Sequence, residues 1–362
     1  MTDDFVAAFN QNDYATAARL VKARLKANPR DPMALLYAGK LQEQAGKAES
    51  AGHLYRQLLK ETTNLKIAMQ ARQGLQRLEA AEQAARQARI AQATLNDDNS
   101  RTGFLILKAI PPEGKAESAK YFARIFQLDP YTARMQLPSR GWKLYRTGAL
   151  GALNVYQQEL AAAGIPAFTA SLDAVSNIHL FRVNHLQSDD PNPAIICQNE
   201  AGQQGALSFQ WSEVARCVKG LLPIFGDVVD LGAWKRLQWK ERMQDYVQVY
   251  DLHIPRRNCI LRFCDSSYQF QHGLSFSQEV ADGAIAQSTI RINWNHLLQY
   301  LDRHLEGVPV WTDFTTFAET ALDHLDLVDG LHAHIDILRE ADSNWDPAFH
   351  LYSSLIFLHD GA

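Results

Sequence analysis

The residues best able to carry out chemistry are histidines and aspartates near the end of the chain. Seven of them lie within one short stretch: Asp323, His324, Asp326, Asp329, His332, His334 and Asp336. Imidazole and carboxylate groups are common ligands of transition metals. The hydrophobic pattern predicts a helix over Leu327–Arg339, and a helix brings residues i and i+4 together, so His332 and His334 would point apart. The spacing therefore predicts no metal site.

A second chemical candidate is the segment Gly226-Asp227-Val228-Val229-Asp230. One glycine and two carboxylates could form a phosphate or metal loop, but no second glycine or lysine follows in P-loop order. We therefore predict a buried turn.

Nucleophilic catalysis has no recognisable pattern either. Gly-x-Ser-x-Gly is absent, and the four cysteines form neither a Cys-x-x-Cys pair nor a zinc spacing: Cys197, Cys217, Cys259 and Cys264. Cys259 and Cys264 are five residues apart on a predicted strand, which places them on opposite faces. The sequence thus predicts no catalytic residue, no metal and no cofactor.

Composition sets the class of protein. The chain has 362 residues, 46% hydrophobic and 21% charged, with a net charge of −4. This length allows two or three domains. The net charge does not indicate the basic surface that nucleic-acid binding needs. No apolar run of about 18 residues predicts a membrane span, and the acidic start lacks the features of a signal peptide. We expect a cytoplasmic protein with reduced cysteines.

The elements that could position a binding site begin with a repeated pattern. Ala17 is followed by Val21, and Ala51 by Tyr55, and the two pairs lie 34 residues apart. A small residue lets two helices approach closely, and a bulky residue one turn later fills the gap between neighbouring hairpins. On these residues the region 1–96 resembles the tetratricopeptide repeat family, which implies pairs of antiparallel helices.

That resemblance also implies a binding surface. Members of the family bind an extended or helical peptide on a concave face, which here would carry Asp3, Val6, Asn10, Tyr37, Lys40 and Gln44. In the chaperone-binding members, Lys and Asn side chains clamp a C-terminal carboxylate. Val6 stands where that clamp has Asn, so we do not expect a chaperone tail. The alternative is that the repeats only pack on the next domain.

A third unit begins at Lys66–Leu78 but does not turn back. The following segment, Glu79–Thr94, consists mainly of Ala, Gln and Arg. This composition favours a helix with little apolar surface to bury, and it predicts a solvated capping helix. A coiled-coil partner strand is the alternative, although no heptad pattern continues beyond Leu78.

The region 102–171 predicts the element order β-α-α-β-α-β. It contains the apolar strand Leu105-Ile106-Leu107, a helix start at Asp129 and a helix end at Gly164. On these residues it resembles the C-terminal domain of ribosomal protein L7/L12 and the ClpS adaptor, which implies a small docking domain. In ClpS an Asn-Asp-Asp motif holds the free amine of a degradation signal. The matching place here reads Ala109–Glu113, so we do not expect that activity.

The region 176–362 predicts a mixed β/α domain. Its predicted elements are a short helix, two strands and an amphipathic helix: Ser212–Leu222, Tyr246–Ile254, Asn258–Phe263 and Asn293–Leu305. Strands closed by a helix are similar in pattern to small pleckstrin-homology barrels, so we expect such a barrel near 176–306 and a helical tail over 312–362. The whole chain is also similar to tetratricopeptide-containing proteins of photosynthetic bacteria.

Taken together, the sequence predicts an α+β multidomain protein without enzymatic activity. We expect an adaptor or assembly factor that binds protein partners through the repeats and the middle docking domain, without nucleic acid, and possible self-assembly into a homo-oligomer. The alternative is an enzyme or ligand sensor with a C-terminal pocket. A cavity that collects Asp227, Asp230, His253 or Arg257 would favour this alternative.

Overall fold

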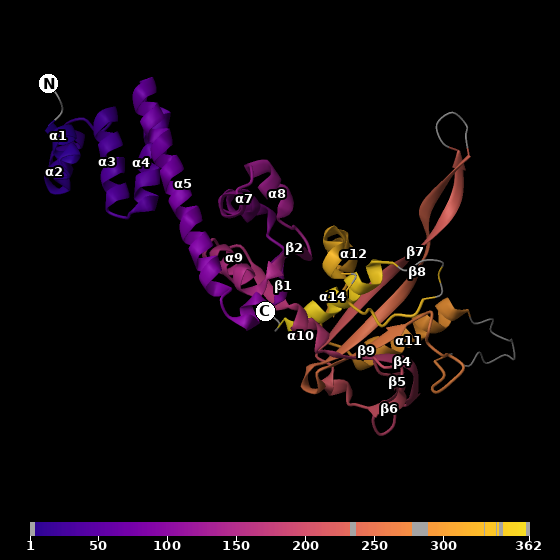
Figure 1. Cartoon of the computed structure of the whole chain (residues 1–362). Helices are drawn as coiled ribbons and strands as arrows, with labels where there is room; N and C mark the ends of the chain where they lie inside the picture. Colours follow the sequence, from indigo (N-terminus) through magenta and orange to yellow (C-terminus); the bar gives the residue numbers. More distant parts are fainter. Residues whose placement is uncertain are drawn as a thin grey trace. The chain divides into compact units, whose positions relative to one another are not determined.

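The computed structural model describes these residues: 4–231, 237–276, 289–328, 330–337, 339 and 343–359. They form a mixed α/β structure, with a helical N-terminal region and a sheet-rich C-terminal part (Figure 1). The chain divides into two compact units, Met1–Gln92 and Ala93–Ala362. The regions expected to be a middle and a C-terminal domain thus lie in one unit.

The first unit consists of helices joined by short turns. They are α1 (Asp4–Asn10), α2 (Tyr14–Ala27), α3 (Pro32–Gln44), α4 (Ala48–Glu61) and α5 (Leu65–Ala93). Short connections make consecutive helices antiparallel neighbours. The long α5 includes the Ala-, Gln- and Arg-rich segment, as its composition predicts.

Side-chain caps and close packing explain this arrangement. The Asp31 carboxylate accepts hydrogen bonds from the N–H groups of Met33 and Ala34 at the start of α3, which satisfies backbone donors that the helix leaves unpaired. Ala17 and Ala51, the small residues of the repeated pattern, are fully buried.

A small antiparallel sheet opens the second unit. Its order is β2 (Trp142–Ala149), β1 (Thr102–Lys108) and β3 (Ala167–Ser171). The side chains of β1 alternate between two cores, because successive residues of a strand face opposite sides. Leu105 and Leu107 pack against the helices of this region, whereas Phe104 and Ile106 join the core of the C-terminal part.

The helices of this region follow the order that the hydrophobic pattern predicts. They are α7 (Pro112–Phe126), α8 (Pro130–Gln136) and α9 (Leu150–Ala162), with the short α6 (Asp97–Ser100) and α10 (Leu172–Ser176) at the two ends. Asp129 caps α8 by accepting from the N–H groups of Tyr131 and Thr132.

The described residues of the C-terminal part form a seven-stranded sheet. Its order is β10 (Val310–Trp311), β7 (Arg216–Leu231), β8 (Leu237–Ile254), β9 (Cys259–Cys264), β4 (His179–Ser188), β5 (Ala194–Gln198) and β6 (Gln204–Ser208). Among the described residues no ladder joins β6 to β10, so the described strands form an open sheet rather than the expected barrel. The long antiparallel pair β7 and β8 is the main feature of this sheet (Figure 1).

Helices cover both faces of this sheet. One face packs on α11 (Ile290–His304) through Trp294, Leu297 and Leu301. The other packs on α12 (Phe314–Ala321) and α14 (Trp345–Leu358), and α13 (Leu325–Val328) lies between these two helices in the chain. Cys259 and Cys264 belong to opposite cores, as their spacing predicts.

Three local predictions are wrong. Most of Ser212–Leu222 lies in β7 rather than in a helix, and Gly226–Asp230 continues that strand instead of forming a turn. The β-branched Val228 and Val229 favour a strand, and pairing with β8 fixes it. The expected helix over Leu327–Arg339 ends at Val328, just before Gly330, a residue type that often interrupts helices.

No helix of the described residues is long and apolar enough to cross a membrane.

Candidate protein-interaction site

The predicted groove residues lie on α1 and α3, at different depths. Tyr37 is buried, Val6 and Lys40 are half-buried, and Asn10 and Gln44 are exposed at the last residues of their helices. Asp3 lies outside the described residues. The structure therefore brings Val6, Tyr37 and Lys40 to one cluster and leaves two amide side chains at its margin.

The centre of this cluster is aromatic. The Tyr37 ring meets Phe5 and Phe9 of α1 edge to face, with centroids 5.5 and 5.2 Å apart. This is the geometry that the charge distribution of aromatic rings favours. These contacts fix α1 against α3, and they show that Tyr37 supports the surface more than it projects from it.

Lys40 continues the cluster toward α5. Its ammonium group lies 4.6 Å from the centroid of the Tyr37 ring and donates to Gln70 Oε1 at 3.0 Å. Burial lowers the pKa of this ammonium group, and repulsion from Arg77 adds to the effect, while attraction to Glu43 opposes it. Lys40 is thus a partly desolvated cation with one neutral hydrogen-bond partner.

A charged pair connects α3 and α5 one turn further on. Arg77 donates to both carboxylate oxygens of Glu43, at 2.8 and 2.9 Å, and the Tyr55 hydroxyl donates to the same group at 2.7 Å. Burial acts to raise the Glu43 pKa, but the hydrogen bonds from Arg77 and Tyr55 outweigh it and lower the pKa.

These contacts define a surface that we call the α1–α3–α5 face. It comprises Phe9, Tyr37, Lys40, Glu43, Gln70 and Arg77. Sequence reasoning missed four of these residues. The 34-residue offset between Glu43 and Arg77 equals the period of the repeat, and this signal could have identified the pair.

The C-terminal alternative, an enzyme or ligand sensor, would be favoured by a cavity that collects Asp227, Asp230, His253 or Arg257, and neither of the hollows described below is lined by any of these residues. Asp227 is exposed far along β7, and Asp230 lies still further along that strand. His253 is fully buried on β8, and Arg257 pairs with Glu213 at 2.7 Å. The ladder pairs Asp227 with Glu241 but His253 with Arg216, so Asp227 and His253 are many residues apart along the hairpin and cannot share a site.

A serine, a histidine and an aspartate do meet in the core. The Ser353 hydroxyl donates to Asp251 Oδ2 at 2.6 Å and lies 2.9 Å from His253 Nε2. Because the single hydroxyl proton goes to Asp251, His253 Nε2 must be the donor in the second bond. A catalytic serine instead gives its proton to histidine, so this arrangement is not a nucleophile and base.

The same aspartate forms a buried ion pair. Arg262 donates to Asp251 through two nitrogens, at 2.9 and 2.6 Å, and its guanidinium lies 5.0 Å from the centroid of the Phe349 ring. Buried charges are tolerated when they are paired and hydrogen-bonded. The network therefore has a structural role: it links β8, β9 and α14.

The histidines of the segment near the end of the chain lie closer together than the predicted helix would place them. The His332 and His334 rings lie 5.8 Å apart, and His334 lies 5.9 Å from His350, because Leu331–Ile337 is not helical. Across the part of the chain that the structure describes, no group of three His, Cys, Asp or Glu residues is placed to hold a metal ion. All four cysteines are buried.

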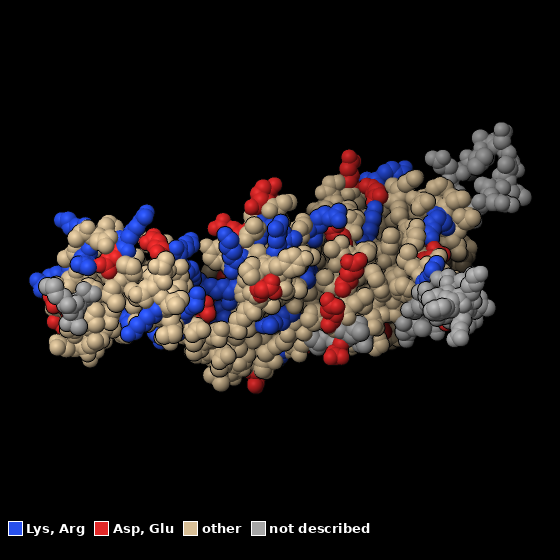
Figure 2. Space-filling model, turned by 90° about the horizontal axis from the view of Figure 1, so that it is seen from above, with Lys and Arg blue, Asp and Glu red and all other residues tan. Residues whose placement is uncertain are grey.

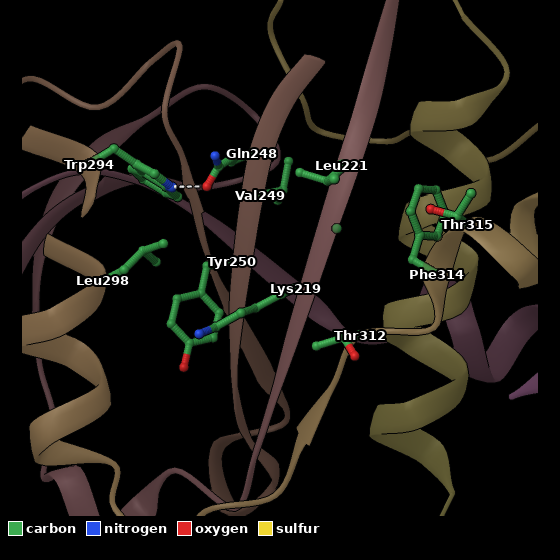
Figure 3. A pocket seen from close by; sticks show the side chains of 11 residues that line it. Lys219, Leu221, Gln248, Val249, Tyr250, Trp294, Leu298, Thr312, Phe314 and Thr315 are labelled. Atoms are coloured by element: carbon green, nitrogen blue, oxygen red, sulfur yellow. Dashed lines mark hydrogen bonds between the residues drawn. The ribbon is translucent and has the colours of Figure 1, made fainter. Parts of the chain in front are cut away.

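Two of the hollows among the described residues lie in the second unit. One, of about 240 Å³, is lined by Arg140, Trp142, Lys143 and neighbouring residues of α8 and α12. The other, of about 230 Å³, lies beside β7 and is lined by residues of β7, β8, α11 and α12 (Figure 3).

Comparison with family models, curated proteins and solved structures finds no match to this chain.

Proposed function

We propose that this protein is a non-enzymatic adaptor or assembly factor that holds a polypeptide segment on the α1–α3–α5 face. The observation that carries the proposal is the unbroken series of contacts from Phe9 through Tyr37 and Lys40 to Gln70. These contacts join three helices into one surface with an aromatic floor and a cation at its centre. The resemblance to tetratricopeptide repeats supports the same use of this face.

The chemistry of the face suits an extended backbone. Lys40 can exchange its bond to the neutral Gln70 amide oxygen for a carboxylate oxygen of a bound segment, because a hydrogen bond between two ionised groups is stronger than one to a neutral oxygen. The exposed amides of Asn10 and Gln44 supply further donors and acceptors at the margin. Apolar side chains of the segment would rest against Phe9 and Val6.

The middle region would serve as a second docking surface. Tyr131 and Met135 lie one turn apart on α8 and are 75% and 65% exposed, so both side chains can supply apolar contacts to a partner. Thr102–Ser171 holds eight Lys and Arg residues against four Asp and Glu residues. Lys and Arg side chains are prominent on the face of the molecule in Figure 2. An acidic partner suits this region.

The test is affinity capture by the intact protein from its native lysate, quantified by mass spectrometry. We expect a stoichiometric partner that is lost with Lys40→Glu and with the pair Tyr37→Ala and Lys40→Ala. Lys22→Glu, at an exposed position of α2, is the matched control for charge reversal. Capture that is empty, or that Lys22→Glu weakens as much as Lys40→Glu, would refute the proposal.

A separate variant tests the second docking surface, on α8. Tyr131→Ala with Met135→Ala removes exposed side chains, so the fold is retained, and we expect loss of a different partner from the one that needs Lys40. Leu95→Ala, which removes another exposed apolar side chain, is the control. Loss of the same single partner from both surfaces would mean that the protein does not connect two polypeptides.

Self-assembly through the repeats is a second candidate, favoured by one observation. Leu65 and Met69 lie one turn apart on α5 and are 86% and 54% exposed. Sedimentation velocity over a range of concentrations tests it. A mass that rises with concentration in the wild type, and not in Leu65→Lys, would support self-assembly, and a constant mass would exclude it.

A further inference from the structure

The outer edge of β7 is only partly paired. β10 runs parallel to β7 but pairs only with Cys217 and Val218, whereas β7 continues to Leu231. Within the described residues no other strand pairs with this edge beyond β10. An edge of this kind presents N–H and C=O groups that can pair with another chain.

The alternation of backbone groups along β7 identifies which N–H and C=O groups face outward. The Cys217 N–H donates to the Pro309 carbonyl at 2.9 Å, so it points to the β10 side. Backbone groups of a strand alternate between its two edges, and Leu221 therefore presents both its N–H and its C=O outward beyond the end of β10. The next outward position is Pro223, which has no N–H and is tolerated in a strand at such an edge.

The hollow beside β7 lies at this same place. Lys219, Gly220 and Leu221 of β7 line it, together with Tyr250 and Trp294 on one side of the strand and Phe314 and Thr315 on the other (Figure 3). The hollow thus extends around the strand edge. Leu221 itself is 48% exposed.

Polar side chains that line the hollow already have partners within the protein. Trp294 Nε1 donates to Gln248 Oε1 at 2.8 Å, and Lys219 Nζ lies 3.1 Å from Asp302 Oδ1. The surface left to a ligand is therefore mainly aromatic and aliphatic. At about 230 Å³ the hollow is smaller than usual small-molecule sites of roughly 300–1,000 Å³, and its size suits one or two side chains.

We propose that the β7 edge at Leu221 binds an extended apolar segment of a partner polypeptide, which adds a strand to the sheet beyond β10. The partner's backbone pairs with the N–H and C=O of Leu221. Its side chains alternate between the Tyr250–Trp294 side and the Phe314 side, so apolar residues are needed at successive positions. Strand addition of this kind gains affinity from the backbone and specificity from the pockets.

A second copy of this chain fits the edge less well. In an antiparallel pairing of two β7 edges centred on Leu221, Pro223 of one copy would lie opposite Lys219 of the other. Proline has no N–H, so the carbonyl of Lys219 would lose its partner in both copies. A partner strand of different sequence avoids this loss.

The experiment selects ligands from a displayed library of short random peptides with the intact protein as bait. We expect peptides with successive apolar residues, whose affinity is measured by fluorescence anisotropy. Leu221→Pro, which removes the outward N–H, should weaken binding about tenfold or more, the effect of roughly one hydrogen bond and its geometry. Leu221→Ala keeps the N–H and should retain most of the affinity.

A second measurement needs no variant of the protein. N-methylation of each amide of a selected peptide in turn should weaken binding at every second position, because a strand pairs through alternate residues. Selection of no peptide, or of peptides insensitive to Leu221→Pro and without this alternation, would overturn the proposal. A mass of the chain alone that rises with concentration, and not in Leu221→Pro, would identify a second copy as the occupant and overturn it as well.

Discussion

Tyr55 shows how one side chain sets the spacing of three helices. Its ring comes from α4 and lies between Gly39 of α3 and Gly74 of α5. A Cβ added at either glycine would lie 2.5 Å from a ring atom. Because the Tyr55 hydroxyl also donates to Glu43, the ring cannot move aside without losing that bond. The glycines are therefore needed for space.

Gly74→Ala is expected to destabilise the first unit by about 1–3 kcal/mol through overpacking. This outweighs the roughly 1 kcal/mol that alanine gains over glycine in a helix. Hydrogen exchange of the α3 and α4 amides measures the effect. Gly52→Ala is the control, since its Cβ would come no closer than 3.6 Å to the end of Arg56, and it should stabilise. Stabilisation by both substitutions would contradict this packing argument.

His253 makes the second unit sensitive to pH. Burial lowers the pKa of His253 to about 3, and repulsion from Arg216 and Arg262 adds to the effect. In the unfolded chain the pKa is about 6.5, so between these values the unfolded chain binds a proton that the folded chain does not. The stability from neutral His253 is therefore complete above about pH 6.5 and decreases as the pH falls toward 3.

His253→Gln should make this dependence shallower by up to about 1.4 kcal/mol per pH unit between pH 6.5 and 5. Denaturant unfolding at a series of pH values measures the slope. His179→Gln changes an exposed residue of β4 and is expected to leave the slope as it is. Equal slopes for the wild type and His253→Gln would show that His253 is not the group responsible.

At the scale of elements, α8 depends on its first residues. It has only seven residues, and isolated helices of this length are unstable. Its N-terminus is held by Asp129, whose carboxylate accepts from Tyr131 and Thr132. These hydrogen bonds lower the pKa of Asp129. The cap thus orders the helix that carries the exposed Tyr131 and Met135.

Asp129→Ala should lower the local stability of α8, because the backbone N–H groups at its start lose their acceptor, whereas Asp129→Asn, which can also cap, should lower it much less. Hydrogen exchange of the α8 amides distinguishes the two variants. The alanine variant should also bind the proposed second partner more weakly. Equal exchange in both variants would mean that tertiary packing, not the cap, holds α8.

Local patterns predicted the elements with strong periodicity and missed those fixed by distant pairing. The helical repeats and the order of the middle elements follow from caps, glycines and apolar spacing. The strand character of Gly226–Asp230 depends on its pairing with β8, which no short window of sequence contains. For the site, the resemblance to the repeat family implied that Tyr37 and Lys40 share one face, but Gln70 is recognised only through its bond from Lys40.

At the scale of the molecule, the middle region is not separable from the C-terminal part. Phe104, Ile106 and Leu144 of the small sheet belong to the same core as Phe317 and Tyr352 of α12 and α14. Removing the C-terminal part would expose one whole face of that sheet. Exposed apolar surface of this extent leads to association or loss of order.

A fragment of residues 102–171 is therefore expected to bind a hydrophobic dye and give a poorly dispersed nuclear magnetic resonance spectrum. A fragment of residues 93–362 should give a dispersed spectrum, because it keeps both faces of the small sheet covered. A well-ordered 102–171 fragment would show that the middle region folds independently.

The core that the small sheet shares with α12 and α14 also sets an order of events during synthesis. β1 (Thr102–Lys108) leaves the ribosome long before α12 (Phe314–Ala321) and α14 (Trp345–Leu358), whose buried side chains belong to the same core as Phe104 and Ile106. Until these helices emerge, one face of the small sheet lacks most of its core partners, and partly folded chains with exposed apolar surface aggregate readily. The helices of the first unit emerge earlier and have their own core. Nascent chains should therefore carry a folded first unit while the second unit still needs protection by chaperones.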